Sequence, residues 1–219
     1  MHPHDIRPHR RGFLIASTAA VLALAGCASA PPVAQRYAPN PDGTTYSYWR
    51  TTTGSFGNAE GRVDWRIGSQ TWQGRPVLAS VSPQAGTTLY DPVSHAIVAQ
   101  LNPAGQATAV FTPPIGPRMP MAVGDRYTTQ HKLDMPLAGR SMTMEVQWVV
   151  EAHERITVKA GTWDAWRWVS TNSFGEVERV WTQPEQGLGI IRREISRPAS
   201  HPQGAGTLTG ELIEFKRPN

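Results

Sequence analysis

Three glutamates are the residues in this sequence whose types and spacing could best support catalysis. Glu145, Glu151 and Glu154 lie within ten positions of one another, and two carboxyl groups held at one site can act as general acid and general base. The same spacing also fits the solvated face of a strand, where these side chains would form ion pairs with Arg155 and Arg167. Of the two interpretations, we expect the solvated face.

Other catalytic and metal-binding patterns are missing from the sequence. It contains no GxSxG, SxxK, HExxH or GxxxxGK[ST] motif, so the common hydrolase, zinc-protease and nucleotide-binding classes lack their signatures. We therefore expect no enzyme activity, no metal and no cofactor; a hydrolase assembled from dispersed carboxylates and histidines is the least favoured alternative. The histidines that follow the N-terminal region are too widely spaced for a short metal-binding motif: His95, His131, His153 and His201.

Tryptophan is the unusual component, with eight residues in the chain. Trp166 and Trp168 would share one face of a strand, and Trp163 would lie on the other. These aromatic residues either fill the concave face of a curved sheet or line a cavity for a hydrophobic ligand. The candidate lining residues are Met144, Trp148, Trp166 and Trp168.

Alternating apolar and polar residues predict the elements that position these side chains. Residues 63–67, 142–150 and 209–215 alternate with a period of two, which is typical of half-buried antiparallel strands. The 20 glycines and 19 prolines suit a protein rich in turns. In the alternating segments we expect Met142, Met144, Val146 and Trp148 to point inward.

The pattern predicts an all-β protein of roughly ten to twelve short strands. The expected architecture is a single antiparallel curved sheet, or a half-open barrel of clam-like shape. The proline-rich segment 112–120 should interrupt the sheet between residues 43–111 and 121–219. Val63-x-Trp65 and Val146-x-Trp148 add the alternative that the domain consists of two similar β halves.

Residues 1–26 form an export signal rather than part of the fold. Positive charge at Arg7, Arg10 and Arg11 precedes an apolar run of 14 residues, which is shorter than the roughly 20 residues of a membrane-spanning helix. The run ends at Cys27, the single cysteine of the chain. An internal disulfide and a cysteine-based zinc site are thereby excluded.

Leu24-Ala25-Gly26-Cys27 resembles the lipobox of bacterial lipoproteins. This resemblance implies cleavage before Cys27, acylation of its thiol and new amine, and attachment to the lipid bilayer. Because Ala28 stands where the inner-membrane retention signal has Asp, the resemblance implies an outer-membrane location facing the periplasm. An ordinary secretory signal with a buried cysteine is the alternative.

Arg10-Arg11-Gly12-Phe13-Leu14 resembles the twin-arginine export motif. If the motif is active, the domain is exported already folded, and the alternative is general secretion. His9 and Ile15 depart from the usual flanking residues of the motif.

The rest of the chain is expected to have two parts. Residues 27–42 are rich in Pro and Ala and predict a lipidated, extended tether, with a disordered tail as the alternative. Residues 43–219 form the β-rich periplasmic domain. The formal net charge is +4, and no Lys or Arg cluster is longer than a pair, so nucleic-acid binding is not expected.

Three segments of the C-terminal half resemble β-rich bacterial envelope proteins of the TapB-like and uncharacterised-domain families. They are MPMAVGDRY (119–127), VKAGTWDAWRW (158–168) and ERVWTQPEQGLGIIRRE (178–194). The resemblance implies an antiparallel curved sheet in the periplasm, and it carries over no catalytic residues. In these segments Gly161 and Gly187 suit turn positions with positive φ.

Two functions follow from these observations. The first is a membrane-anchored lipoprotein that binds a hydrophobic envelope ligand in a β cavity. The alternative is a non-catalytic structural or assembly protein that contacts protein partners in the cell envelope. An open cavity would favour the first function, and a filled interior the second.

Overall fold

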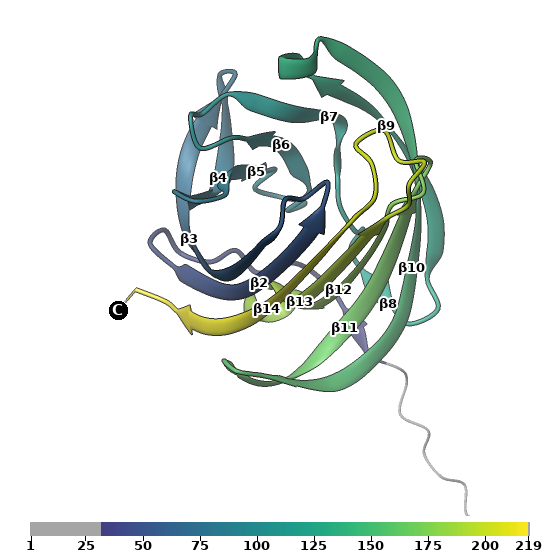
Figure 1. The fold of residues 1–219 in the computed structure, drawn as a ribbon. Coiled ribbons are helices and arrows are strands. Elements are labelled where there is room, and N and C mark those ends of the chain that lie inside the picture. Colours follow the sequence, from purple (N-terminus) through teal and green to yellow (C-terminus); the bar gives the residue numbers. More distant parts are fainter. Residues whose placement is uncertain (1–31, 219) are drawn as a thin grey trace, which may run out of the picture. The chain divides into compact units, whose positions relative to one another are not determined.

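A computed structural model describes residues 32–218 of the chain. Twelve strands form one closed antiparallel barrel in the order β10-β11-β12-β13-β14-β2-β3-β4-β5-β6-β7-β9 (Figure 1). Two short strands, β1 and β8, pair separately. The strands are β1 (Val33–Ala34), β2 (Thr45–Gly54), β3 (Ala59–Trp72), β4 (Arg75–Ser82), β5 (Gly86–Tyr90), β6 (Ile97–Leu101), β7 (Ala107–Ile115), β8 (Met121–Ala122), β9 (Arg126–Met135), β10 (Arg140–Val158), β11 (Gly161–Asn172), β12 (Val177–Gln183), β13 (Leu188–Arg197) and β14 (Gly206–Lys216), with single turns of 3-10 helix at Pro136–Ala138 and Pro184–Gln186.

The all-β prediction is confirmed, but the open curved sheet and the half-open barrel are wrong. The sheet closes because β14 pairs with β2, for example at Leu208 and Thr52, and β7 pairs with β9. Closure leaves no unpaired edge strand in the barrel. The two predicted halves, 43–111 and 121–219, therefore share one continuous sheet.

The predicted proline interruption begins later than expected. β7 continues through Pro113 and Pro114 to Ile115, while its pairing with β9 ends at Thr112. Proline lacks the N–H that a ladder needs, so it is tolerated where the strand has lost a partner.

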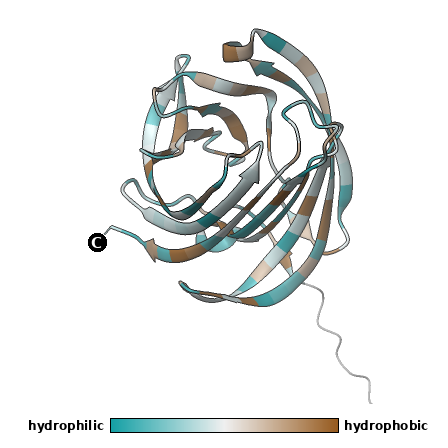
Figure 2. Cartoon of the chain, in the orientation of Figure 1, coloured by the Kyte–Doolittle hydropathy of each residue, from teal (hydrophilic) through white to brown (hydrophobic). Residues whose placement is uncertain are grey.

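Strand β10 shows the predicted inward set. Met144, Val146 and Trp148 are buried, whereas Glu145 and Gln147 between them are exposed. Figure 2 shows the corresponding alternation of brown and teal along β10 and β11. The strand register expected from the sequence is confirmed, except that Met142 is only half-buried.

The long β10–β11 hairpin bends so that its tip contacts strand β14 of the same barrel. A β-bulge between Val150 and Ala152 shifts the register, and a bulge increases local bending and twist. At the hairpin tip the Ala160 amide donates a hydrogen bond to the Leu212 carbonyl of β14, at 3.2 Å. Gly161 has a φ of +146°, so the predicted positive-φ turn is present there.

The segment that follows the predicted lipid anchor packs against the barrel. β1 pairs with β8, the Ala38 amide donates to the Pro184 carbonyl at 2.8 Å, and Asn40 Nδ2 donates to the Gly187 carbonyl at 2.6 Å. Residues 33–40, assigned to the tether from the sequence, thus contact the folded domain. Residues 1–31, including Arg10, Arg11 and Cys27, lie outside the described residues. None of the helices in the described part of the chain has the length and apolarity needed to cross a bilayer.

Candidate functional site

The four predicted ligand-lining residues lie together in one packed cluster. Met144, Trp148, Trp166 and Trp168 are 4%, 4%, 3% and 8% exposed. The ring centroids of Trp148 and Trp168 are 5.3 Å apart, and Trp148 Nε1 donates to Thr129 Oγ1 at 2.9 Å. Buried tryptophans normally place their N–H on such a partner.

The β1–β8 pair completes this cluster. Ala34 and Met121 are 0% and 1% exposed and pack against the buried tryptophans. Neither of the two surface grooves found among residues 32–218 is lined by the four predicted residues. In this structure these side chains fill the barrel half formed by β9 to β12, as a hydrophobic core does.

Two of the three glutamates share one arginine as their ion-pair partner. Arg167 contacts Glu151 at 3.1 Å and Glu154 at 2.8 Å. Glu154 also accepts a hydrogen bond from Trp181 Nε1 at 2.8 Å. Glu145 lies elsewhere, where its backbone contacts Ser173. The predicted pairing with Arg167 is present for Glu151 and Glu154, whereas Glu145 and Arg155 form no ion pair within residues 32–218.

The histidines make separate contacts in the structure. Within residues 32–218 no three His, Cys, Asp or Glu side chains come together as a metal site. His131 is 3% exposed, and its ring nitrogens hydrogen-bond the Pro113 carbonyl and Thr129, each at 2.8 Å. The His153 ring packs against Trp166 in a tilted arrangement, with ring centroids 4.5 Å apart. These two histidines have structural partners.

Polar residues occupy another part of the barrel interior. A cross-strand row runs from Val180 through Arg193, Gly210 and Arg50 to Gly61. Val180 belongs to the buried tryptophan cluster, and residues in one cross-strand row share a face of the sheet. Arg193 and Arg50 therefore point into the barrel.

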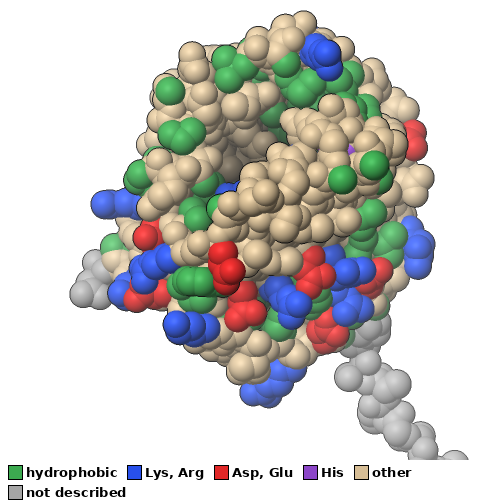
Figure 3. Space-filling view, viewed as in Figure 1, with side chains coloured by type: hydrophobic (Ala, Val, Ile, Leu, Met, Phe, Trp, Pro, Cys, Tyr) green, Lys and Arg blue, Asp and Glu red, His purple; other side chains and the backbone are tan. Residues whose placement is uncertain are grey.

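Water reaches this polar part of the interior. The Arg193 and Glu178 side chains form an ion pair at 2.6 Å and remain 28% and 19% exposed, although both face inward. A second inward ion pair joins Arg197 and Glu176 at 2.5 Å. Their side chains are 16% and 18% exposed, respectively. Figure 3 shows a hollow in the molecule where the barrel end faces the viewer. The barrel interior thus combines packed apolar clusters with a group of inward-facing polar side chains, which we call the polar interior: Tyr48, Arg50, Tyr90, Glu178 and Arg193.

The charges of the polar interior act on one another. Burial, followed by the nearby Arg193 charge, lowers the pKa of Arg50. Burial by itself lowers the pKa of Arg193, but the opposing effects of Glu178, Tyr90 and Glu176 together raise that pKa above its usual value. Burial, with a contribution from Tyr90, raises the pKa of Tyr48 well above its usual value. These mutual effects place the five groups in one electrostatic neighbourhood.

The sequence analysis anticipated only part of this site. Opposite charges on the two strands of the 178–194 hairpin indicate a surface ion pair between Arg193 and Glu178, and the pair exists but faces inward. Arg50, Tyr48 and Tyr90 were missed. The signal was present in the alternation of residues 46–52, where Tyr48 and Arg50 share a face with the buried Tyr46 and Thr52.

An aromatic stack adjoins the polar interior at Tyr90. The His95 ring lies between Tyr37 and Tyr90, with centroid distances of 3.5 Å and 4.5 Å. The Tyr37 hydroxyl donates to the Gly187 carbonyl at 2.8 Å. Burial lowers the pKa of His95 to about 4, so the ring is neutral at pH 7.

His95 is expected to make the fold acid-sensitive. Below pH 6.5 the unfolded chain binds a proton at His95, while the folded chain does not until about pH 4. Its stabilising contribution is therefore complete above pH 6.5 and is lost as pH falls to about 4, by up to about 3 kcal/mol. His95→Phe keeps an aromatic ring and removes the titration. The measurement is the free energy of unfolding at pH 7 and pH 4.5, and an equal acid loss in both proteins would contradict the prediction.

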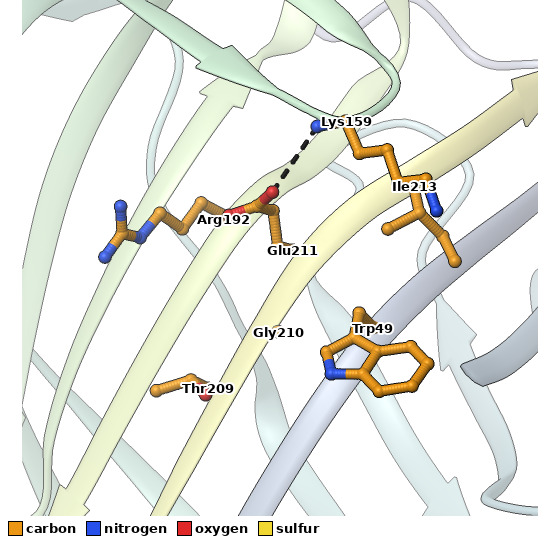
Figure 4. Close-up of a pocket in the computed structure, with 7 residues that line it drawn as sticks. All are labelled: Trp49, Lys159, Arg192, Thr209, Gly210, Glu211 and Ile213. Carbon is orange, nitrogen blue, oxygen red and sulfur yellow. Dashed lines mark hydrogen bonds between the residues drawn. The ribbon is translucent and has the colours of Figure 1, made fainter. Parts of the chain in front are cut away.

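A shallow groove of about 360 Å³ lies on the outer face of the barrel (Figure 4). Trp49, which is 47% exposed, forms one side, and Lys159, Arg192 and Glu211 form the other. The Lys159 amide donates to Glu211 at 3.4 Å. The groove is open to solvent, and its charged groups face water.

Comparisons with known proteins give two structural similarities. No family model matches the sequence, and no curated protein matches it. A putative lipoprotein from Parabacteroides distasonis has 14% identity and a TM-score of 0.43, over 84% of this chain and 99% of that chain. A putative exported protein with a YmcC-like fold from Bacteroides fragilis has 13% identity and a TM-score of 0.43, over 84% of this chain and 100% of that chain. Similarity at this level does not establish a shared function, and the resemblance to TapB-like proteins is unconfirmed.

Proposed function

We propose that this protein is a lipid-anchored binding protein of the bacterial envelope. Acylated Cys27 would hold it in the outer membrane, with the barrel facing the periplasm. The support for this anchoring is the position of the single cysteine after a short apolar run, and several acyl chains anchor stably where one chain does not.

The wet polar interior is the observation that carries the binding role. The inward-facing Arg193 and Glu178 side chains are 28% and 19% exposed, so they border space that a ligand could take. The apolar half, by contrast, is filled by tryptophans that are at most 8% exposed. A ligand with polar groups therefore fits better than the hydrophobic envelope ligand expected from the sequence.

A binding role also fits the chemistry of the polar interior better than catalysis. Arg193 and Glu178 neutralise each other at 2.6 Å. Burial raises the pKa of both Tyr48 and Tyr90, so their hydroxyls stay protonated at pH 7. A general base needs a pKa near the working pH, and neither hydroxyl offers one. We propose that the protein holds its ligand without transforming it.

Native mass spectrometry of the lipidated protein, extracted from its own envelope in mild detergent, tests this function. The proposal predicts an additional small-molecule mass on the folded protein that disappears on denaturation. The alternative, a structural or assembly protein, predicts no small-molecule adduct together with protein partners captured by cross-linking. That second result would overturn the binding role.

A further inference from the structure

Arg50 and Arg193 lie on either side of a residue that has no side chain. Gly210 is the direct cross-strand neighbour of both arginines. Since adjacent strands are about 4.8 Å apart, the Cα atoms of the two arginines are separated by roughly 10 Å. Two long, inward-pointing guanidinium side chains can converge over that span.

The inward charges do not balance. Arg193 pairs with Glu178 and Arg197 pairs with Glu176. Arg50 forms no ion pair within residues 32–218, and its buried Nε has no hydrogen-bond partner there. An unsatisfied buried donor, above all on a charged group, costs folding free energy. The interior thus presents a cation with an unused N–H.

The space over this row is not filled by other side chains. A Cβ atom built at Gly210 or Gly61 would meet no described atom within 4 Å. Arg50 lies directly between these two glycines across the strands. The unpaired guanidinium therefore borders free volume in the part of the barrel that water reaches.

We propose that the polar interior binds the anionic group of a small ligand, a carboxylate or a phosphate, between Arg50 and Arg193 above Gly210. This inference rests on the proposed function of an interior binding site. The planar fork of N–H groups on Arg50 would bind two oxygens of the anion, since guanidinium pairs bidentately with carboxylate and phosphate. Arg193, still held by Glu178, would add a second positive charge.

Anion titration of the full chain tests the proposal, with inorganic phosphate and acetate as probes at constant ionic strength. Phosphate or acetate should raise the thermal midpoint of the wild type. Arg50→Gln should weaken the anion's apparent affinity by at least about tenfold. Arg62→Gln is the matched control, because Arg62 lies on the outer face, paired with Asp64 and Glu214; it should bind the anion as the wild type does.

The two probes also separate the outcomes. Stronger stabilisation by phosphate assigns a phosphate-bearing ligand, and stronger stabilisation by acetate assigns a carboxylate. Equal stabilisation of wild type and Arg50→Gln, or none in either, overturns the anion site. If a bound molecule is still found by native mass spectrometry in that case, the binding function stands and only its anionic character is wrong.

Discussion

Trp148→Ala is expected to lower the free energy of unfolding by about 3–5 kcal/mol, because the change leaves a large cavity in a packed core. Trp148 is 4% exposed, packs against Trp168 and donates its N–H to Thr129. The alanine variant loses both interactions and leaves the Thr129 hydroxyl one partner short. Chemical denaturation followed by circular dichroism measures the change.

Two further variants make this result specific. Trp49→Ala removes a tryptophan that is 47% exposed, and its cost should be roughly 0.5 kcal/mol. Trp148→Phe retains most of the ring and should fall between the two alanine variants. If Trp148→Ala costs no more than Trp49→Ala, Trp148 is not core, and the filled half of the barrel has been misassigned.

Cys27→Ala is expected to abolish lipid attachment completely. Cys27 is the only thiol in the chain, and a thiol is the group that accepts the diacylglycerol in the lipoproteins that this segment resembles. Cells grown with labelled palmitate should incorporate label into the wild type and not into Cys27→Ala, which should be soluble or unprocessed. Equal label in both proteins would contradict the anchoring.

Ala28→Asp serves as the matched control for that experiment. It leaves the thiol in place and introduces the residue that retains lipoproteins in the inner membrane. This variant should incorporate palmitate like the wild type but fractionate with the inner membrane. An unlabelled Ala28→Asp would mean that the loss of label in Cys27→Ala reflects damage to the signal.

Local periodicity predicted the faces of the strands well. The alternation around Met144, Val146 and Trp148 gave the inward set correctly, because a one-residue slip would have exposed all three. The closure of the barrel depends on pairing between β14 and β2, whose partners lie about 150 residues apart. Nothing in the sequence of either strand specifies that partner, so an open sheet was predicted.

The candidate site was predicted only in fragments. The opposite charges on the two strands of the 178–194 hairpin indicate that Arg193 and Glu178 lie together, because cross-strand neighbours of opposite charge pair favourably. The sequence does not reveal that this face of the sheet points into the barrel, since the charged residues of an alternating strand normally lie on its solvent-exposed face. Arg50 was missed for the same reason. The tryptophans were found, but burial in a core and lining of a cavity produce the same pattern.

Thiol labelling of Gly210→Cys, compared with Val146→Cys, tests the central claim that solvent enters the polar interior of the barrel. Both changes are made in a Cys27→Ser background, which removes the only native cysteine. Gly210 borders free volume beside Arg50 and Arg193, whereas Val146 is 2% exposed in the packed half. Nearby arginines favour the reactive thiolate. The account predicts that a small charged thiol reagent modifies folded Gly210→Cys rapidly and leaves folded Val146→Cys unmodified until it unfolds. Equal protection of both thiols would show a closed interior and contradict the account.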